Sequence, residues 1–288
     1  MIEVSVPVRI DISPGWTDAE PFCSSFGGAV LNAAISLRAK VVLAGNKLIS
    51  SLEKIPSESG LGTSGAVRAA YLVAVAPSLA RNKTELIKKV HEFENKILEE
   101  HAGLQDQAAA IFGGVNFWRF SSRKIERKPL AKRVADELEG RIALLYTGEK
   151  HLSYNVHKKV YSSRNYARAL PKLKKLKKIS ERMFSSINKQ NPNWESFAEL
   201  MNLAWSVEKT LYNGIETQRM RKLRARLGEL FLSARATGAG GGGSMIFFTT
   251  KEKLPKLKQA LKKESKQMPN SCLINFRFDH KGMIVKRA

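Results

Sequence analysis

Two glycine-rich segments constrain the fold of this chain more than any other feature. The first, PSESGLGTSGAVRAA (residues 56–70), places three glycines at the start of a helical pattern, and the second, ATGAGGGGS (residues 236–244), holds five glycines among nine residues. Backbone amides at a helix start bind phosphate, and glycine lets the ligand approach closely. A tight packing turn explains the first segment equally well. A flexible linker is a poorer account of the second, because apolar segments flank it closely.

The residues around the first segment exclude two common nucleotide-binding folds. Gly60, Gly62 and Gly65 match the pattern GxGxxG, but SLEKIPSES precedes them where a dinucleotide-binding fold has a buried strand. A P-loop is excluded because no Gly-Lys-Ser or Gly-Lys-Thr closes the segment.

Periodicity along the chain predicts a mixed α+β fold rather than a strict βαβ repeat. Strands are expected at residues 2–12, 29–37, 40–43, 116–120, 142–147, 245–249, 273–277 and 283–286. Helices are expected at residues 63–76, 83–100, 105–112, 154–162, 173–188, 194–203 and 217–233. The basic stretch KIERKPLAK (residues 124–132) has little periodicity, which places a boundary between it and Gly140.

Glu94 gives the clearest physical signal of a functional acid. It lies inside the apolar stripe of the predicted helix 83–100, between Val90 and Ile97. A carboxylate on a core-facing side must be paired, protonated or bound to a cation, because an unpaired buried charge is very costly. A metal ligand and a structural ion pair fit this position equally well.

Two more charged residues stand at the ends of predicted elements. Asp106 lies near the start of helix 105–112, whose positive end would keep the carboxylate ionised, as a general base or an electrostatic anchor requires. An ordinary first-turn residue has the same placement. Arg9 precedes Asp11 by two residues on one strand face, where it either pairs with Asp11 or faces a site. The five histidines are scattered, so no Ser/His/Asp or Cys/His set emerges.

The charge balance narrows the classes of partner. Against 26 Asp and Glu, the chain has 49 Lys and Arg, and the formal net charge of +23 favours nucleic acid, lipid headgroups or a phosphorylated small molecule. Much of this charge lies at residues 171–178 and 251–266, where leucines recur at helical spacing, as in amphipathic helices with solvated basic faces.

The sequence shows little sign of a membrane span, a leader, a disulfide or a cysteine metal site. No apolar run reaches the roughly 18 residues of a membrane span, and the first residues alternate like a strand rather than forming a leader. Cys23 and Cys272 follow no ligand spacing. These features predict a cytoplasmic protein with no membrane partner, disulfide or cysteine zinc site.

Taken together, the segments resemble the three motifs of the GHMP kinases, the superfamily of galactokinase, homoserine kinase, mevalonate kinase and phosphomevalonate kinase. PVRIDISPGWTD is similar to the first motif, IPSESGLGTSGA to the second and ATGAGGGG to the third. Within the superfamily the sequence most resembles the L-fucokinase and D-glycero-D-manno-heptose 7-phosphate kinase branch, through FGGAVLNAAI, LQDQAAAIFGGVNF, ALLYTGEKH, LMNLAWSVEKTL and INFRFDHKGMIV. The likeness covers nearly the whole chain.

The resemblance implies an α+β, two-domain GHMP kinase fold and a set of site residues. A ribosomal-protein S5-like N-terminal domain would span residues 1–139, and a ferredoxin-like C-terminal domain residues 140–288. By resemblance, Asp106 is the catalytic aspartate, Arg9 lies near the transferred phosphate, and Ser64 and Glu94 hold Mg²⁺. Trp16, Thr17 and Asp18 would hold sugar hydroxyls. ATP would be held by Ser57, Ser59, Gly60, Leu61, Gly62, Thr63, Ser64 and Gly65, supported by Gly238, Gly240 and Gly241.

The activity implied is ATP- and Mg²⁺-dependent phosphorylation of the anomeric hydroxyl of a sugar or sugar phosphate, heptose 7-phosphate or fucose-like. The charge surplus favours a phosphorylated acceptor, and the resemblance leaves room for a homodimer. The alternative is a catalytically silent nucleotide- or nucleic-acid-binding protein on the same scaffold. Against nucleic acid, PKLKKLKK has no interleaved aromatic residues.

The chain departs most from the family between Ser36 and Pro56. Only 19 residues separate them, where relatives have a longer stretch that helps form the pocket for the nucleotide base. The shortening predicts that contacts to the base are lost while those to the phosphates remain.

Overall fold

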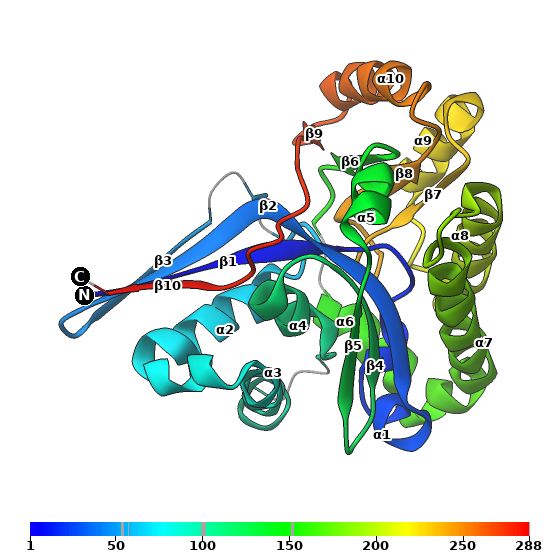
Figure 1. Cartoon of the computed structure of the whole chain (residues 1–288). Helices are drawn as coiled ribbons and strands as arrows, with labels where there is room; N and C mark the ends of the chain where they lie inside the picture. Colours follow the sequence, from blue (N-terminus) through cyan, green and yellow to red (C-terminus); the bar gives the residue numbers. More distant parts are fainter. Residues whose placement is uncertain (53–54, 57, 99–101, 151–152, 288) are drawn as a thin grey trace.

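The computed structural model describes residues 1–52, 55–56, 58–98, 102–150 and 153–287, which form two antiparallel β-sheets with helices packed around them (Figure 1). The larger sheet has the strand order β10-β1-β2-β4-β5, and β3 also pairs with β2. Its strands are β1 (Ile2–Asp11), β2 (Gly28–Ala44), β3 (Lys47–Leu52), β4 (Val115–Phe120), β5 (Ile125–Pro129) and β10 (Ile284–Arg287).

Small residues let two helices pack closely on the larger sheet. α2 (Thr63–Val75) and α4 (Gln105–Phe112) both contact β1 and β2, and each buries a run of alanines against them. The chain reaches β2 through α1 (Phe22–Phe26). Between α2 and α4 lies α3 (Lys83–Glu92), which continues as a π-helical turn, Phe93–Ile97. The starts of α2 and α4 are thereby held beside the end of β1.

The smaller sheet has the strand order β7-β8-β6-β9. It consists of β6 (Ile142–Tyr146), β7 (Ser233–Ala236), β8 (Ser244–Phe248) and β9 (Cys272–Ile274). The helices of this half are α5 (Lys132–Glu139), α6 (Ser153–Tyr161), α7 (Ser163–Ile187), α8 (Trp194–Glu208), α9 (Gln218–Leu227) and α10 (Leu254–Lys266). α10 packs on β6 and β9, and α8 packs on β7. Because α7 contacts both α8 and β2, this pair of helices joins the two sheets.

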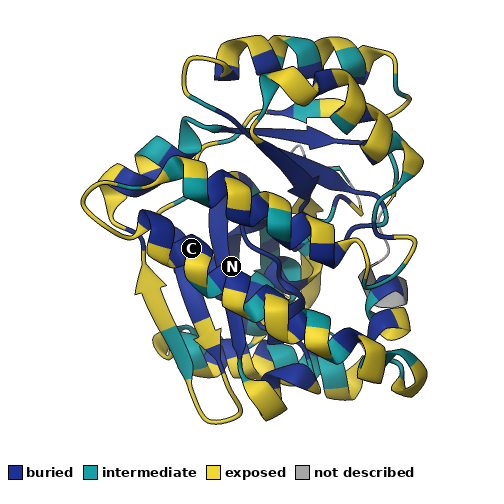
Figure 2. Cartoon of the chain, turned by 90° about the vertical axis from the view of Figure 1, so that its right-hand side faces the viewer, coloured by how far each residue is buried: buried dark blue, intermediate teal, exposed yellow. Residues whose placement is uncertain are grey.

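The two lysine-rich stretches form amphipathic helices, as predicted. Leu173 and Leu176 of α7 are fully buried, as are Leu257 and Leu261 of α10. Figure 2 shows the buried residues on the inner faces of the helices and the exposed residues on their outer faces.

The fold class is confirmed, but several element boundaries were wrong. Residues 29–37 and 40–43 belong to one strand of 17 residues, β2. The predicted helix 217–233 ends at Leu227 and is followed by a short 3₁₀ turn and then by β7. α7 begins ten residues before the predicted helix 173–188 and continues through Pro171. α1, β3, β5 and α5 were not predicted.

The last strand of the described chain returns to the larger sheet. β10 pairs with β1 from Ile2 opposite Arg287 to Ser5 opposite Ile284, so the two ends of the chain lie side by side (Figure 1). The division of the chain between residues 139 and 140 stays a prediction, and a homodimer does as well. Within the described residues, no helix is both long and apolar enough to cross a membrane.

Candidate active site

A cavity opens where the end of β1, the starts of α2 and α4 and the segment after β7 meet. It is lined by eight of the residues proposed from the sequence: Arg9, Trp16, Asp18, Ser64, Gly65, Glu94, Asp106 and Gly238. Segments more than 200 residues apart in the chain therefore contribute to one site, as the three glycine-containing motifs predicted.

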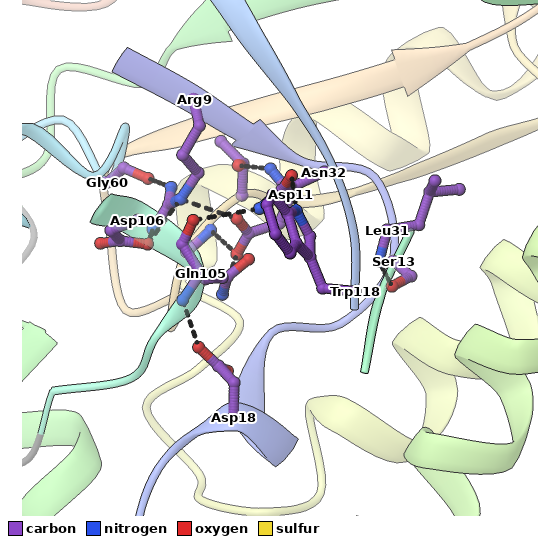
Figure 3. Close-up of polar contacts among 12 residues, drawn as sticks. Arg9, Asp11, Ser13, Asp18, Leu31, Asn32, Gly60, Gln105, Asp106 and Trp118 are labelled. Carbon is purple, nitrogen blue, oxygen red and sulfur yellow. Dashed lines mark hydrogen bonds and ion pairs between the residues drawn. The ribbon is translucent and has the colours of Figure 1, made fainter. Parts of the chain in front are cut away.

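Arg9 and two aspartates form the charged centre of this cavity (Figure 3). Arg9 Nε lies 2.8 Å from Asp106 Oδ1, and Nη2 lies 2.7 Å from the same oxygen. Arg9 Nε is also 2.9 Å from Asp11 Oδ1, and Nη1 donates to the carbonyl of Gly60 at 2.6 Å. Burial lowers the pKa of Arg9, but the two carboxylates outweigh this effect and raise the pKa above its ordinary value. Arg9 is therefore a fixed cation.

The first glycine-rich segment wraps closely around this centre. Gly60 and Gly62 have φ of +73° and +69°, and a Cβ on Gly62 would lie 3.0 Å from both Arg9 and Asp106. Leu61 is fully buried, and its carbonyl accepts from the Arg9 amide at 2.9 Å. The glycines therefore allow the loop to pass directly over the charged centre, because a side chain at Gly62 would crowd it.

Two buried hydroxyls of the same segment are available to bond a ligand. Ser59 Oγ and Thr63 Oγ1 are buried, and neither has a hydrogen-bond partner among the described residues. Such groups are costly unless something bonds them. Ser64 is exposed in the first turn of α2, where backbone amides have no partner within the helix. The loop has the chemistry of a phosphate site; Ser57 lies outside the described residues.

Glu94 is buried in the π-helical turn and paired with a cation of the protein itself. Its Oε1 lies 2.8 Å from Arg68 Nη1, and both side chains line the cavity. Arg68 follows Ser64 by one helical turn on α2, so the Arg68–Glu94 ion pair lies close to Ser64. Both sequence interpretations of Glu94 therefore keep support: it has an ion-pair partner, and it faces the cavity.

The donor set around Glu94 fits magnesium that is shared with a ligand. The described residues contain no group of three or more His, Cys, Asp or Glu placed to hold a metal ion. Mg²⁺ commonly takes one or two protein oxygens, several waters and substrate phosphates. Ser64 Oγ and the Glu94 carboxylate would supply two such oxygens beside the phosphate loop.

The residues of the Trp16–Asp18 turn differ in whether their side chains reach the cavity. Trp16 lines the cavity, and its ring centroid lies 4.9 Å from that of His157, which also lines it. Thr17 does not reach the cavity: its hydroxyl donates to the Ala29 carbonyl and accepts from the Ala29 amide. The sugar-binding role predicted for Thr17 therefore lacks a route to the cavity in this structure.

Asp18 holds the start of the helix that carries Asp106. Its Oδ2 accepts from the amides of Leu104 and Gln105, both at 2.9 Å (Figure 3). Burial raises the pKa of Asp18 to about 7, although the amide of Gln105 acts in the opposite direction. Asp18 both anchors α4 and lines the cavity.

The second glycine-rich segment packs against the first. Gly238 has φ +80°, and a Cβ there would lie 2.8 Å from the Gly60 carbonyl oxygen. The Gly238 amide donates to Asp11 Oδ2 at 3.0 Å. Gly240 and Gly241 lie farther away and pack against the loop at Ile215, whose carbonyl accepts from the Gly241 amide. Of these three glycines, Gly238 is therefore the one that packs against the first glycine-rich segment.

Among the residues in and behind the cavity that sequence reasoning missed are Arg68, His157, Glu208 and Arg235. Arg68 could have been found, because it lies four residues after Ser64 on the same helix. His157 reaches the cavity through tertiary packing of α6, for which the sequence carries no signal. Glu208 and Arg235 form a fully buried ion pair behind the cavity, and they lie in or beside segments that the resemblance had already singled out.

Two family models match the chain. The model described as "GHMP kinases N terminal domain" matches residues 29–114, and "GHMP kinases C terminal" matches residues 183–267. Together they cover more than half of the chain. The chain belongs to the GHMP kinase family.

Relatives of this GHMP kinase act on different small molecules. D-glycero-alpha-D-manno-heptose 7-phosphate kinase of Campylobacter jejuni is 25% identical over 91% of this chain and 94% of its own length. The bifunctional fucokinase/GDP-fucose pyrophosphorylase of Arabidopsis thaliana is 23% identical over 91% of this chain, which spans 31% of that larger protein.

Solved structures of the family share the two-domain fold. A D-glycero-D-manno-heptose 1-phosphate kinase of Bacteroides thetaiotaomicron has a TM-score of 0.75 at 19% identity, covering 100% of this GHMP kinase and 99% of that chain. Galactokinase of Lactococcus lactis, complexed with galactose, has a TM-score of 0.69 at 17% identity, covering 100% and 95%.

Proposed function

We propose that this GHMP kinase is a sugar kinase, which uses ATP and Mg²⁺ to phosphorylate the anomeric hydroxyl of a sugar or sugar phosphate. The relatives named as heptose phosphate kinase, fucokinase and galactokinase support the class of acceptor. A heptose 7-phosphate is the preferred acceptor, because a heptose 7-phosphate kinase matches this chain over nearly its whole length and the net charge of +23 favours a phosphorylated molecule.

The environment of Asp106 is the observation that carries this proposal. Its Oδ1 is held by two nitrogens of Arg9, whereas its Oδ2 has no hydrogen-bond partner among the described residues. The side chain is 28% exposed and faces the cavity beside the phosphate loop. An acceptor hydroxyl bound there would donate to Oδ2, and Asp106 would orient it or take its proton as it attacks.

Arg9 would stabilise the negative charge that develops during phosphoryl transfer. It is fixed by Asp11, Asp106 and the Gly60 carbonyl, so its charge needs no rearrangement when negative charge develops on the transferred group. When bound, Mg²⁺ would offset charge on the phosphate oxygens, with Ser64 and Glu94 as its ligands. The buried hydroxyls of Ser59 and Thr63 and the first-turn amides of α2 would hold the phosphates themselves.

The acceptor is expected beside Trp16 and Asp18, which also line the cavity. The indole of Trp16 offers an apolar face to a sugar ring, and the Asp18 carboxylate lies at the start of α4 close to it. A panel of free sugars, hexose phosphates and heptose 7-phosphates tests the proposal directly, with ADP release measured in the presence of Mg²⁺. If a folded protein turns over none of them, the proposed function is wrong.

Replacing Asp106 by asparagine tests the mechanism. Asp106→Asn keeps the size of the side chain but removes its charge and its capacity to take a proton, so kcat should fall about 100-fold or more with little change in nucleotide affinity. Asp136→Asn is the matched control, because Asp136 lies exposed on α5, pairs with Lys132 and does not line the cavity. Near-normal turnover of folded Asp106→Asn would remove Asp106 from the mechanism.

A further inference from the structure

Behind the cavity lies a charged pair that takes no part in the proposed chemistry. Glu208 ends α8, Arg235 lies in β7, and both side chains are fully buried. Arg235 Nη2 lies 3.0 Å from Glu208 Oε1 and 2.9 Å from Oε2, and Nε lies 3.2 Å from Oε2. Burial raises the pKa of Glu208 even against the attraction of Arg235. Because removing two charges from water is costly, such a pair contributes little net stability compared with apolar side chains of the same size.

Within the described part of the chain, the side chain of each member makes one further hydrogen bond, and both bonds lead to the wall of the cavity. Trp16 Nε1 donates to Glu208 Oε1 at 2.9 Å. Arg235 Nη1 donates to the Asp11 carbonyl at 2.7 Å. Trp16 and Asp11 both line the cavity, whereas neither Glu208 nor Arg235 does. β7 of the smaller sheet and α8, which packs on it, thus bond the last residue of β1 and the turn that follows it.

The segment after Arg235 strengthens this connection. Two residues later, Thr237 Oγ1 accepts from the Asp11 amide at 2.7 Å, and the Gly238 amide donates to Asp11 Oδ2. The backbone of Asp11 is therefore bonded at both its N–H and its C=O by β7 and the loop that follows. Asp11 in turn contacts Arg9, which holds Asp106.

We propose that Glu208 and Arg235 are positioning residues that fix the indole of Trp16 and the end of β1 as one wall of the acceptor subsite. The assignment of that wall to the acceptor rests on the proposed function. Neither residue touches a reacting atom. Their effect is carried by the orientation of Trp16 and by the placement of Asp11.

The first experiment removes both charges together. Glu208→Leu with Arg235→Met leaves no unpaired buried charge, so the double variant retains a foldable core, whereas either single change would strand its partner. The KM for the acceptor should rise about tenfold, while the KM for ATP changes less than about twofold. Glu264→Leu with Arg226→Met, an ion pair between α10 and α9 outside the cavity, is the matched control and should change neither constant.

A double-mutant cycle separates positioning from a merely structural role. Trp16→Phe keeps an aromatic ring but loses the Nε1 donor to Glu208. If the pair acts through Trp16, the double variant should change the acceptor KM much less in the Trp16→Phe background than in the native one. Fully additive effects would overturn the proposal.

Fluorine NMR of protein labelled with 5-fluorotryptophan gives a readout that needs no substrate. The Trp16 resonance is assigned by its loss in Trp16→Phe, and it should shift or broaden in the double variant while the Trp194 resonance stays in place. An unchanged Trp16 resonance would overturn the proposal. Failure of every sugar in the panel would instead refute the proposed function, and the spectrum would still decide whether Glu208 and Arg235 position Trp16.

Discussion

Glu94 has two candidate cations in the site, Arg68 and Mg²⁺. Glu94→Gln removes the charge that either would bind, so we expect the Mg²⁺ concentration for half-maximal rate to rise about tenfold if Glu94 is a metal ligand. Arg68→Met removes one cation partner of Glu94 but keeps its carboxylate, so it should not raise that concentration. Rates measured across a Mg²⁺ titration check both variants.

Glu92→Gln is the control for this comparison, because Glu92 lies exposed two residues earlier and pairs with Lys96 and Lys89. If Glu94→Gln does not raise the Mg²⁺ concentration for half-maximal rate, Glu94 has a structural role alone. In that case Glu94→Gln would lower the midpoint of thermal unfolding, while activity per folded molecule and its metal dependence would match those of the native protein.

Asp18 should make stability depend on pH. Its pKa is about 7 in the folded chain and near 3.8 when unfolded, so between these values the folded chain keeps a proton that the unfolded chain has lost. The free energy of unfolding should therefore fall by a few kcal/mol as pH rises from about 4 to 7, and Asp18 adds no further change above that. Asp18→Asn cannot ionise but can still accept from the amides of α4, so its unfolding profile should be flatter in this window.

Chemical denaturation of both proteins across this pH range measures the difference. Asp11 and Glu208, whose pKa values are also raised by burial, titrate in both proteins, so the difference isolates Asp18. Parallel profiles would show that Asp18 keeps its charge throughout the range.

At the scale of elements, the contact between the two glycine-rich segments can be tested with one methyl group. Gly238→Ala places a Cβ 2.8 Å from the Gly60 carbonyl, so the phosphate loop must shift, and we expect the KM for ATP to rise about tenfold. Gly45→Ala is the control: Gly45 also has positive φ, at +57°, but a Cβ there meets nothing within 4 Å. Each variant should lose about 1 kcal/mol of stability from backbone strain. If both variants have the same KM for ATP, the contact between the two glycine-rich segments does not affect ATP binding.

The two strands that sequence analysis missed share a physical cause. β3 is exposed along its whole length and β5 along most of it, so neither shows the alternation that marks a half-buried strand. Pro171 concealed the first ten residues of α7, because proline disfavours a helix interior. Buried elements with strong patterns, such as β1, α2 and α4, were predicted within two residues of their observed ends.

The candidate site also contains some residues that the sequence could indicate and others that it could not. Glu94 could be singled out because a charge in an apolar stripe is conspicuous, and Arg9, Asp106 and the glycine loops because they belong to motifs. Tertiary packing decides the rest. No pattern in the sequence indicates that Thr17 turns toward Ala29, or that Glu208 and Arg235 meet behind Trp16.

At the scale of the whole molecule, the shortened region should weaken discrimination between nucleotides. Residues 37–52 form the outer part of β2 and the hairpin to β3, with Asn46 exposed in its turn. If affinity comes mostly from the triphosphate, ATP and GTP should differ by less than about tenfold in kcat/KM, or roughly 1.4 kcal/mol. Measuring both nucleotides against one accepted sugar decides this. Strong preference for ATP would mean that other residues, Asn46 and Lys47 among them, rebuild a pocket for the base.

The pairing of β1 with β10 also imposes a delay during synthesis. A ribosome adds roughly 5–20 residues per second, so one edge of β1 waits about 15 to 60 s for the strand that covers it. During that interval the nascent chain presents the backbone of an apolar strand to its neighbours, which is a template for pairing between chains. The growing polypeptide, rather than the finished enzyme, is therefore the form most exposed to aggregation, and slower translation lengthens its exposure.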